Sequence, residues 1–119
     1  MELKLDFELN KTDRLSRKFE EIHNFIYAND GLSTQQTLEE FIKILFIKVI
    51  DEKKKEKQFY IDDMEFEQIK SSRKSEKLLR RINSLFSSTI KEYSELFDNG
   101  DRIKLSLLSL ANTVNKLQD

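Results

Sequence analysis

The residues of this 119-residue chain whose types and spacing best suit binding of a charged ligand form a run of cations between Lys70 and Arg81. Six basic residues stand there against one acid, Glu76; the basic residues are Lys70, Arg73, Lys74, Lys77, Arg80 and Arg81. Residues three or four apart share a helix face, so Arg73, Lys77 and either Arg80 or Arg81 are expected to align. Aligned cations suit the phosphate backbone of double-stranded DNA, which they would position without reading its bases. The alternative is an exposed helix face balanced by acids elsewhere, because the formal net charge is −1.

Three other polar groups of residues have structural explanations beside functional ones. The lysine-rich run of 53–57 suits the C-terminal end of a helix, where cations are favourable; a phosphate contact is the alternative. The acids of 62–67 match no calcium-binding loop, and Asp62 as an N-cap before an acidic first turn accounts for them without a metal. His23 is expected to hydrogen-bond within a helical bundle; a polar contact to a partner or to DNA is the alternative.

Composition excludes several kinds of catalytic and binding site. The chain has no Cys and one His, which removes thiolate zinc sites and the HExxH zinc motif. It has no Pro and two Gly, Gly31 and Gly100, which removes P-loops and dinucleotide-binding fingerprints. We therefore assign no catalytic, cofactor-binding or metal-binding residue to this chain, and a stand-alone enzyme is the least favoured class.

Length and hydropathy indicate one domain that folds in water. A content of 38% apolar and 36% charged residues is typical of a globular protein of this length. The longest apolar stretch, within 38–50, is interrupted by Lys43 and Lys48 and is too short to cross a bilayer. No basic segment followed by an apolar core opens the chain, so no secretory signal is predicted. We expect a cytoplasmic protein without membrane contact.

Residues 33–52 are predicted to form the central helix. Ser33 can cap it, and Gln36 completes a capping box. Its apolar residues recur at helical spacing on several sides; they are Leu38, Phe41, Ile42, Ile44, Leu45, Phe46, Ile47, Val49 and Ile50. A helix that is apolar on nearly all sides must be covered by other elements, which places this one in the core. A buried strand is the competing interpretation, but the run is too long for one.

The segment before it predicts a first helix over 12–29. The apolar stripe of that helix consists of Leu15, Phe19, Ile22 and Ile26. Gly31 is expected in the left-handed conformation that ends a helix, so the two helices form a hairpin over 12–52. In residues 1–11, apolar and polar side chains alternate. This pattern indicates a short strand, an extended N-terminal arm or the frayed start of the first helix.

The second half of the chain predicts another helical hairpin, over 75–119. Its first helix covers 75–97 and ends at Gly100, and Asp101 caps the last helix, over 102–117. The side of that last helix away from its leucines is expected to carry small or polar residues: Ser106, Ser109 and Asn112.

Between the hairpins, residues 53–74 are predicted to be a variable connection. Its core anchors are expected to be Phe59, Tyr60 and Ile61. It also contains a short extra helix, whose apolar face would be formed by Met64, Phe66 and Ile69. The whole pattern predicts an all-α fold, a single domain over 1–119 that forms a bundle of four main helices plus this short one.

Two segments of the chain resemble the N-terminal helical region of N6-adenine DNA methyltransferases of restriction-modification systems. They are IHNFIYANDGLS (22–33) and TLEEFIKILFIKVIDE (37–52). The similarity is strongest to modification subunits of type I systems and to related fused enzymes, and it is best over Arg17 to Glu52. The residues that carry it are packing residues rather than catalytic ones.

The resemblance implies a non-catalytic helical domain that packs on a downstream methyltransferase domain and assists binding of double-stranded DNA. It implies specificity and other modification subunits as partners, and S-adenosylmethionine as the cofactor of the full-length protein. The family's Gly-rich cofactor turn and Asn-Pro-Pro-aromatic motif are absent, because the chain has two Gly and no Pro. We therefore expect the front piece of a larger protein or a small non-catalytic relative. A free-standing helical module for protein–protein interaction is the alternative.

Overall fold

The computed structural model describes the backbone of residues 2–72 and 76–118 and the side chains of 14–72 and 76–118. This part of the chain contains five helices and no strand; the helices are α1 (Glu2–Asp30), α2 (Thr34–Glu52), α3 (Asp63–Ser72), α4 (Glu76–Glu92) and α5 (Leu107–Leu117). The prediction of an all-α bundle with four main helices and one short extra helix is confirmed. None of these helices is long and apolar enough to cross a membrane.

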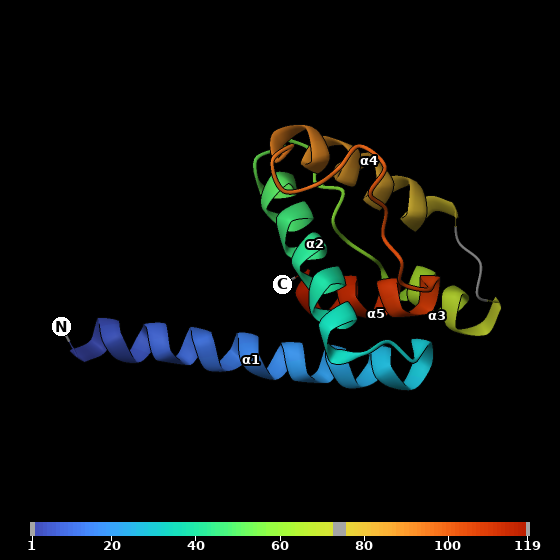
Figure 1. Ribbon diagram of the computed structural model, residues 1–119. Helices are drawn as coiled ribbons and strands as arrows, with labels where there is room; N and C mark the ends of the chain where they lie inside the picture. Colours follow the sequence, from blue (N-terminus) through green and yellow to red (C-terminus); the bar gives the residue numbers. More distant parts are fainter. Residues whose placement is uncertain (1, 73–75, 119) are drawn as a thin grey trace.

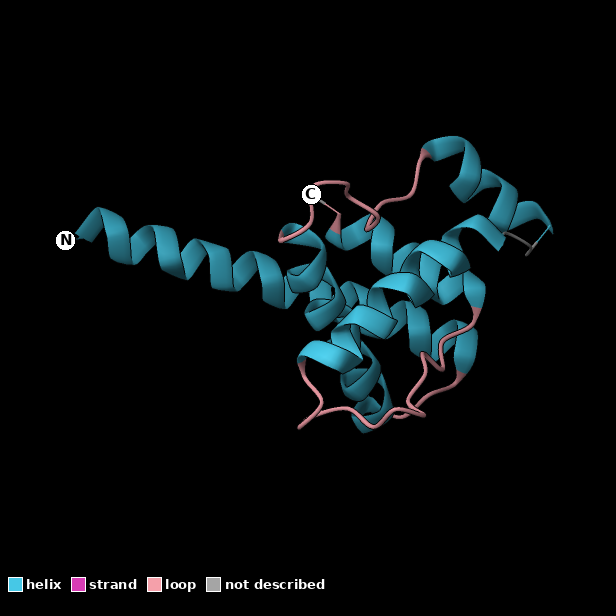
Figure 2. Ribbon diagram, turned by 90° about the horizontal axis from the view of Figure 1, so that it is seen from above, coloured by secondary structure: helices cyan, strands magenta, loops and turns pink. Residues whose placement is uncertain are grey.

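The helices are arranged around α2 and α5. α1 is a long rod whose N-terminal part projects beyond the other helices (Figures 1 and 2). α2 turns back from the end of α1 and leads across the molecule to α4, and it packs against both (Figure 1). α5 packs against α1 and α3. The centre of the core is formed by the side chains that are completely buried, which include Ile22, Ile26, Ile44, Ile47, Ile69, Leu78, Ala111 and Val114.

The N-terminal residues are helical. α1 begins at Glu2 and continues without a break to Asp30, so an extended arm over 1–11 and a short strand are both wrong for the described residues. The remaining alternative, that these residues start the first helix, is the one observed. A strand would need a neighbour for its backbone N–H and C=O groups, and residues 2–72 and 76–118 contain no other strand. A helix pairs these groups within itself.

The corner between α1 and α2 forms as the sequence predicts. Gly31 has φ +71°, and its N–H donates to the carbonyl oxygens of Tyr27 (3.0 Å) and Ile26 (3.2 Å). The Ser33 hydroxyl accepts from the Gln36 N–H (3.1 Å), and the Gln36 side chain accepts from the Ser33 N–H (3.0 Å). Local capping chemistry therefore fixes both helix ends.

α2 is buried on one side only. Its inward apolar residues are Phe41, Ile44, Ile47 and Ile50. Its outward residues Leu38, Ile42 and Val49 are 44%, 39% and 42% exposed, with the half-buried Leu45 between them; we call these four residues the α2 stripe. The prediction that other elements cover this helix on nearly all sides is therefore wrong. The neighbouring α1 and α4 bury the inward side and leave the stripe partly open to solvent.

α4 follows the predicted apolar pattern and ends early. It stops at Glu92, and residues 93–97 form turns instead of completing a helix over 75–97. Its buried apolar residues are Leu78, Ile82, Leu85, Phe86 and Ile90. Beyond the helix, Leu96 is 62% exposed while Phe97 is 8% exposed, because the chain changes direction and returns Phe97 to the core.

α5 begins later than predicted, and its polar side points inward. Its N-cap is Ser106, not Asp101, which instead accepts a hydrogen bond from the Asp98 N–H (3.0 Å) inside the preceding loop. Ser109 and Asn112, expected on the outward side, are both buried. The reason is that α5 is enclosed by α1 and α3, so small side chains on this face allow close packing.

The connection of 53–74 attaches to the core as predicted and contains α3. Phe59 and Ile61 are buried, whereas Tyr60 is partly exposed. Asp62 caps α3, because its carboxylate accepts from the Glu65 N–H (2.8 Å). The predicted apolar face of this helix is wrong at Met64, which is 85% exposed.

Candidate functional site

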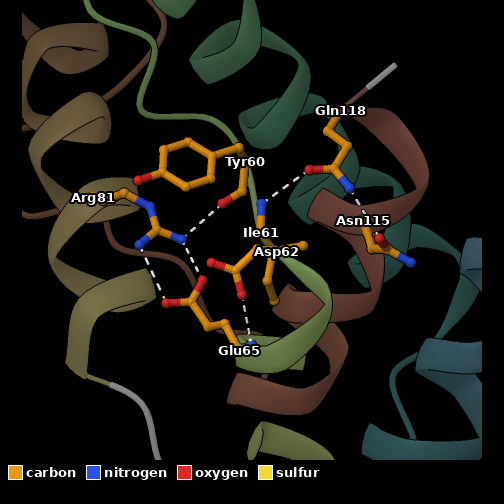
Figure 3. A network of polar contacts seen from close by, with 7 residues as sticks. All are labelled: Tyr60, Ile61, Asp62, Glu65, Arg81, Asn115 and Gln118. Atoms are coloured by element: carbon orange, nitrogen blue, oxygen red, sulfur yellow. Dashed lines mark hydrogen bonds and ion pairs between the residues drawn. The ribbon is translucent and has the colours of Figure 1, made fainter. Parts of the chain in front are cut away.

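Arg81, one of the predicted DNA-backbone residues, is committed to a contact inside the protein. Its guanidinium donates to both carboxylate oxygens of Glu65 (3.2 and 2.5 Å) and to the Tyr60 carbonyl (2.7 Å), as Figure 3 shows. It also lies over the Tyr60 ring, 4.2 Å from the ring centre. The side chains of Arg81 and Glu65 are only 12% and 10% exposed. This bidentate pair therefore ties α4 to α3.

The same network extends to the end of α5. The Ile61 N–H donates to the Gln118 side chain (2.9 Å), and the Gln118 amide donates to Asn115 (3.0 Å) (Figure 3). The backbone of the connection is thus held by polar side chains on both of its sides. These contacts satisfy backbone groups at the edge of the core, and their role is structural.

The other predicted DNA-backbone residues lie on a surface of mixed charge. Lys77 and Arg80 are exposed, and Arg80 pairs with Glu76 (3.2 Å) one turn earlier. Both line a hollow of about 880 Å³ between α3 and α4, together with Arg81 and three acids, Asp62, Glu65 and Glu76. Equal numbers of cations and acids leave little net attraction for phosphate. Arg73 lies outside the described residues.

A more strongly basic surface lies between α1 and α5. Three cations on one face of α1 and one on α5 line a hollow of about 380 Å³; the lining residues are Arg14, Arg17, Lys18, Glu21, Asn115 and Lys116. Lys116 pairs with Glu21 (2.7 Å). The hydrogen bond and charge of Lys116 lower the pKa of the Glu21 carboxyl, and Lys18 adds to this effect. We call this surface the α1–α5 basic hollow.

Sequence reasoning missed the α1–α5 basic hollow for an identifiable reason. The positions of Arg14, Arg17 and Lys18, three and four apart, already placed them on one helix face. However, they do not form a continuous run like that of 70–81. Lys116 is nearly a hundred residues further along the chain, and only the packing of α5 on α1 brings it to them.

The buried charges of α2 were also missed, and they hold loops. Lys43 donates to Glu40 (2.8 Å) and to the Arg102 carbonyl (3.0 Å), while Glu40 accepts from the Lys104 N–H (2.5 Å). Glu40 and Lys43 are both buried, and so is Asp51, whose carboxylate accepts from the Gln58 N–H (2.7 Å). Charged residues on an otherwise apolar helix thus satisfy the backbone of the loops that cross it.

A carboxylate from α1 occupies the N-terminus of α5. Asp30 accepts from the Ser106 N–H (2.9 Å), the Ser106 hydroxyl (2.7 Å) and the Ser109 hydroxyl (2.8 Å). Burial alone would raise the pKa of this carboxyl. The hydrogen bonds from Ser106, Ser109 and Asn29 outweigh burial and hold the pKa below its usual value. The contact therefore joins the end of α1 to the start of α5.

The remaining polar candidates make contacts within the fold. His23 lies 3.2 Å from the Thr34 hydroxyl, so its predicted hydrogen bond within the bundle is confirmed. In the run of 53–57, Lys57 donates to the carbonyls of Asp51 (3.0 Å) and Glu52 (2.7 Å), which is the expected role of a cation at a helix C-terminus. Among the residues whose placement is described, no group of three or more His, Asp or Glu side chains could hold a metal ion.

Among the described residues, the apolar α2 stripe leaves a row of large apolar side chains partly exposed, and the α1–α5 basic hollow gathers an excess of cations. Comparison with protein-family models, with curated proteins and with solved structures found no match for this chain. The function must therefore be argued from these two surfaces and from the sequence.

Proposed function

We propose that this chain is a non-catalytic helical domain of an N6-adenine DNA methyltransferase of a restriction-modification system. It packs on the methyltransferase domain and assists the assembly in binding double-stranded DNA. The observation that carries the proposal is the α2 stripe, because this open apolar surface lies inside the segment, Arg17 to Glu52, that resembles the N-terminal region of such enzymes.

The α2 stripe has the properties of a helix-docking surface. Its four residues follow one another at spacings of four, three and four, so they form one line along α2. A line of this kind fits a groove or a facing helix on a partner. Large apolar side chains that remain partly exposed in one continuous row are typical of interaction sites. The stripe is thus suited to a protein partner rather than to a small ligand or to phosphate.

Methyl transfer itself belongs to the partner in this proposal. The chain has no Gly-rich turn for S-adenosylmethionine and no Asn-Pro-Pro-aromatic motif for the adenine base, since it contains two Gly and no Pro. The downstream methyltransferase domain would supply both, and specificity and other modification subunits would complete the assembly.

The proposal is tested first on the gene and then on the protein. The reading frame after codon 119 should encode a Gly-rich cofactor turn and an Asn-Pro-Pro-aromatic motif. The chain, produced separately, should then co-purify with that catalytic domain, and Ile42→Asp with Val49→Asp should abolish co-purification. Leu96→Asp is the matched control, because Leu96 is also an exposed apolar residue but lies outside the α2 stripe. Retained co-purification of the double variant refutes the docking surface.

The same surface favours a second candidate, a free-standing module for protein–protein interaction. In that case the reading frame ends at Asp119, and the α2 stripe docks on a separate protein. The gene sequence separates the two candidates, because only the first requires methyltransferase motifs in the reading frame after codon 119.

A further inference from the structure

We infer that the α1–α5 basic hollow binds the phosphate backbone of double-stranded DNA. The inference deepens the proposed function, on which it rests, by naming the surface through which the domain would assist DNA binding. This surface is not the cation run of 70–81 but is formed by residues near both ends of the chain, 14–21 and 115–116.

Positive charge is concentrated in the α1–α5 basic hollow. Four cations line the hollow against one acid, Glu21; because Glu21 pairs with Lys116, the lining keeps an excess of three positive charges, on Arg14, Arg17 and Lys18. Arg14 and Arg17 are exposed, so their guanidinium groups are accessible to a ligand. The chain as a whole has a formal net charge of −1, so this local excess of cations does not follow from composition. It arises because three cations share one face of α1 and the fold places Lys116 of α5 beside the one acid of that face, Glu21.

The hollow between α3 and α4 differs from the α1–α5 basic hollow in its balance of charge. There, three cations are matched by three acids, and Arg80 and Arg81 are engaged by Glu76 and Glu65. Exposed charges interact over about 10 Å at ordinary salt, so a polyanion near that surface meets both signs at once. Near the α1–α5 basic hollow it meets mainly cations. The surface that attracts phosphate is therefore the one assembled from distant parts of the chain.

The side chains that line the α1–α5 basic hollow also indicate which polyanion it fits. No aromatic side chain is among the described residues that line the hollow, so it offers no platform on which the bases of a single strand could stack. Arginine guanidinium groups form paired hydrogen bonds with phosphate oxygens, and the Asn115 amide adds a neutral donor. This set of donors suits the regularly spaced phosphates of a duplex backbone.

The test measures binding of a fluorescent duplex of about 20 bp to the full 119-residue chain by anisotropy, at about 50 mM salt, where phosphate contacts are strongest. The test variant is Arg14→Glu with Arg17→Glu. The matched control is Lys77→Glu with Arg80→Glu, which changes the net charge equally on the other hollow. We expect about a tenfold or greater rise in Kd for the test variant, and a fall of about two in its salt slope. The control should stay within about twofold of the unmodified chain.

Three results of the duplex assay would overturn the inference: no duplex binding by the unmodified chain, equal losses in the two variants, or unchanged binding by the test variant. Equal losses would mean that only total charge matters. Vesicles containing phosphatidylserine serve as a second probe; binding to them that exceeds duplex binding at equal salt would assign the surface to membranes instead. Circular dichroism melts confirm that both variants fold.

Failure of this inference and failure of the proposed function can be told apart. Docking on the methyltransferase domain is measured through the α2 stripe, which neither charge-reversal variant alters. Loss of docking with retained, Arg14- and Arg17-dependent duplex binding would refute the proposed function alone. Retained docking with unchanged duplex binding in the test variant would refute the inference alone.

Discussion

Replacement of Asp30 by Ala tests whether the contact between α1 and α5 stabilises the fold. The variant removes an acceptor for the Ser106 N–H, the Ser106 hydroxyl and the Ser109 hydroxyl, at 2.9, 2.7 and 2.8 Å. It also removes a negative charge from the N-terminus of α5, where the helix dipole favours one. Ser109 is buried, so its hydroxyl would lose this carboxylate partner in a place with limited access to water.

The magnitude follows from these losses. Loss of a capping acceptor costs about 1 kcal/mol, and loss of the charge at the helix end adds about 0.5 kcal/mol. The buried Ser109 hydroxyl loses its acceptor but still accepts a hydrogen bond from the Asn29 amide (3.1 Å), which brings the total to about 2 kcal/mol. For a domain of this length, the melting temperature should fall by about 8 °C.

The assay is thermal and urea unfolding followed by circular dichroism. Asp98→Ala is the matched control, since it removes an aspartate from an exposed loop position. The control should change the free energy of unfolding by less than about 0.5 kcal/mol. If Asp30→Ala is no more destabilising than Asp98→Ala, the contact does not stabilise the joint between α1 and α5.

Two further predictions concern charge. The folded state lowers the pKa of Asp30, so the stability that its ionised carboxylate contributes is complete above the unfolded value of 3.8 and is lost as the pH falls through the native pKa. The difference in free energy of unfolding between the unmodified chain and Asp30→Asn should therefore shrink in acid. Urea unfolding at several pH values measures this difference, and a constant difference would contradict the prediction. Lys43→Met leaves Glu40 buried without its cation and should lower the free energy of unfolding by about 3 kcal/mol. The double variant Glu40→Gln/Lys43→Met should recover part of this loss, because it no longer buries an unpaired charge. Urea unfolding measures both variants, and Lys54→Met, at an exposed position, is the control.

The α2 stripe and the α1–α5 basic hollow are proposed to serve different functions, docking on a protein partner and binding of DNA. The α2 stripe is apolar and suited to protein, whereas the α1–α5 basic hollow is charged and suited to phosphate. Because the two surfaces consist of different residues, substitutions can remove docking and DNA binding independently of each other. A domain that both docks on a catalytic partner and holds DNA needs such a division, because strong charge within an apolar contact would oppose burial.

α2 explains why so polar a chain forms one core. Its inward isoleucines pack against α1 and α4, while its buried charges bind the backbone of two loops, at Lys104 and Gln58. These loops cannot cross the core edge with unpaired N–H groups. The charged residues of α2 therefore stabilise the connections between helices rather than interrupt the helix.

The local elements of this protein are determined by nearby residues. The capping box of Ser33 with Gln36, the left-handed Gly31 and the Asp62 cap involve groups within five residues of one another, and the structure contains all of them. Apolar spacing likewise predicts the helical class, because a residue's face depends only on its position along the turn. These features need no knowledge of which helices become neighbours.

Only the tertiary structure decides which faces are covered and which charges meet. It leaves the α2 stripe open, buries Ser109 in α5, and places Asp30 from α1 against Ser106, the N-cap of that helix. It also directs Arg81 to Glu65, away from phosphate. These outcomes depend on pairs of residues separated by sixteen to almost a hundred positions. Periodicity and capping rules describe single segments, so they do not predict contacts between segments.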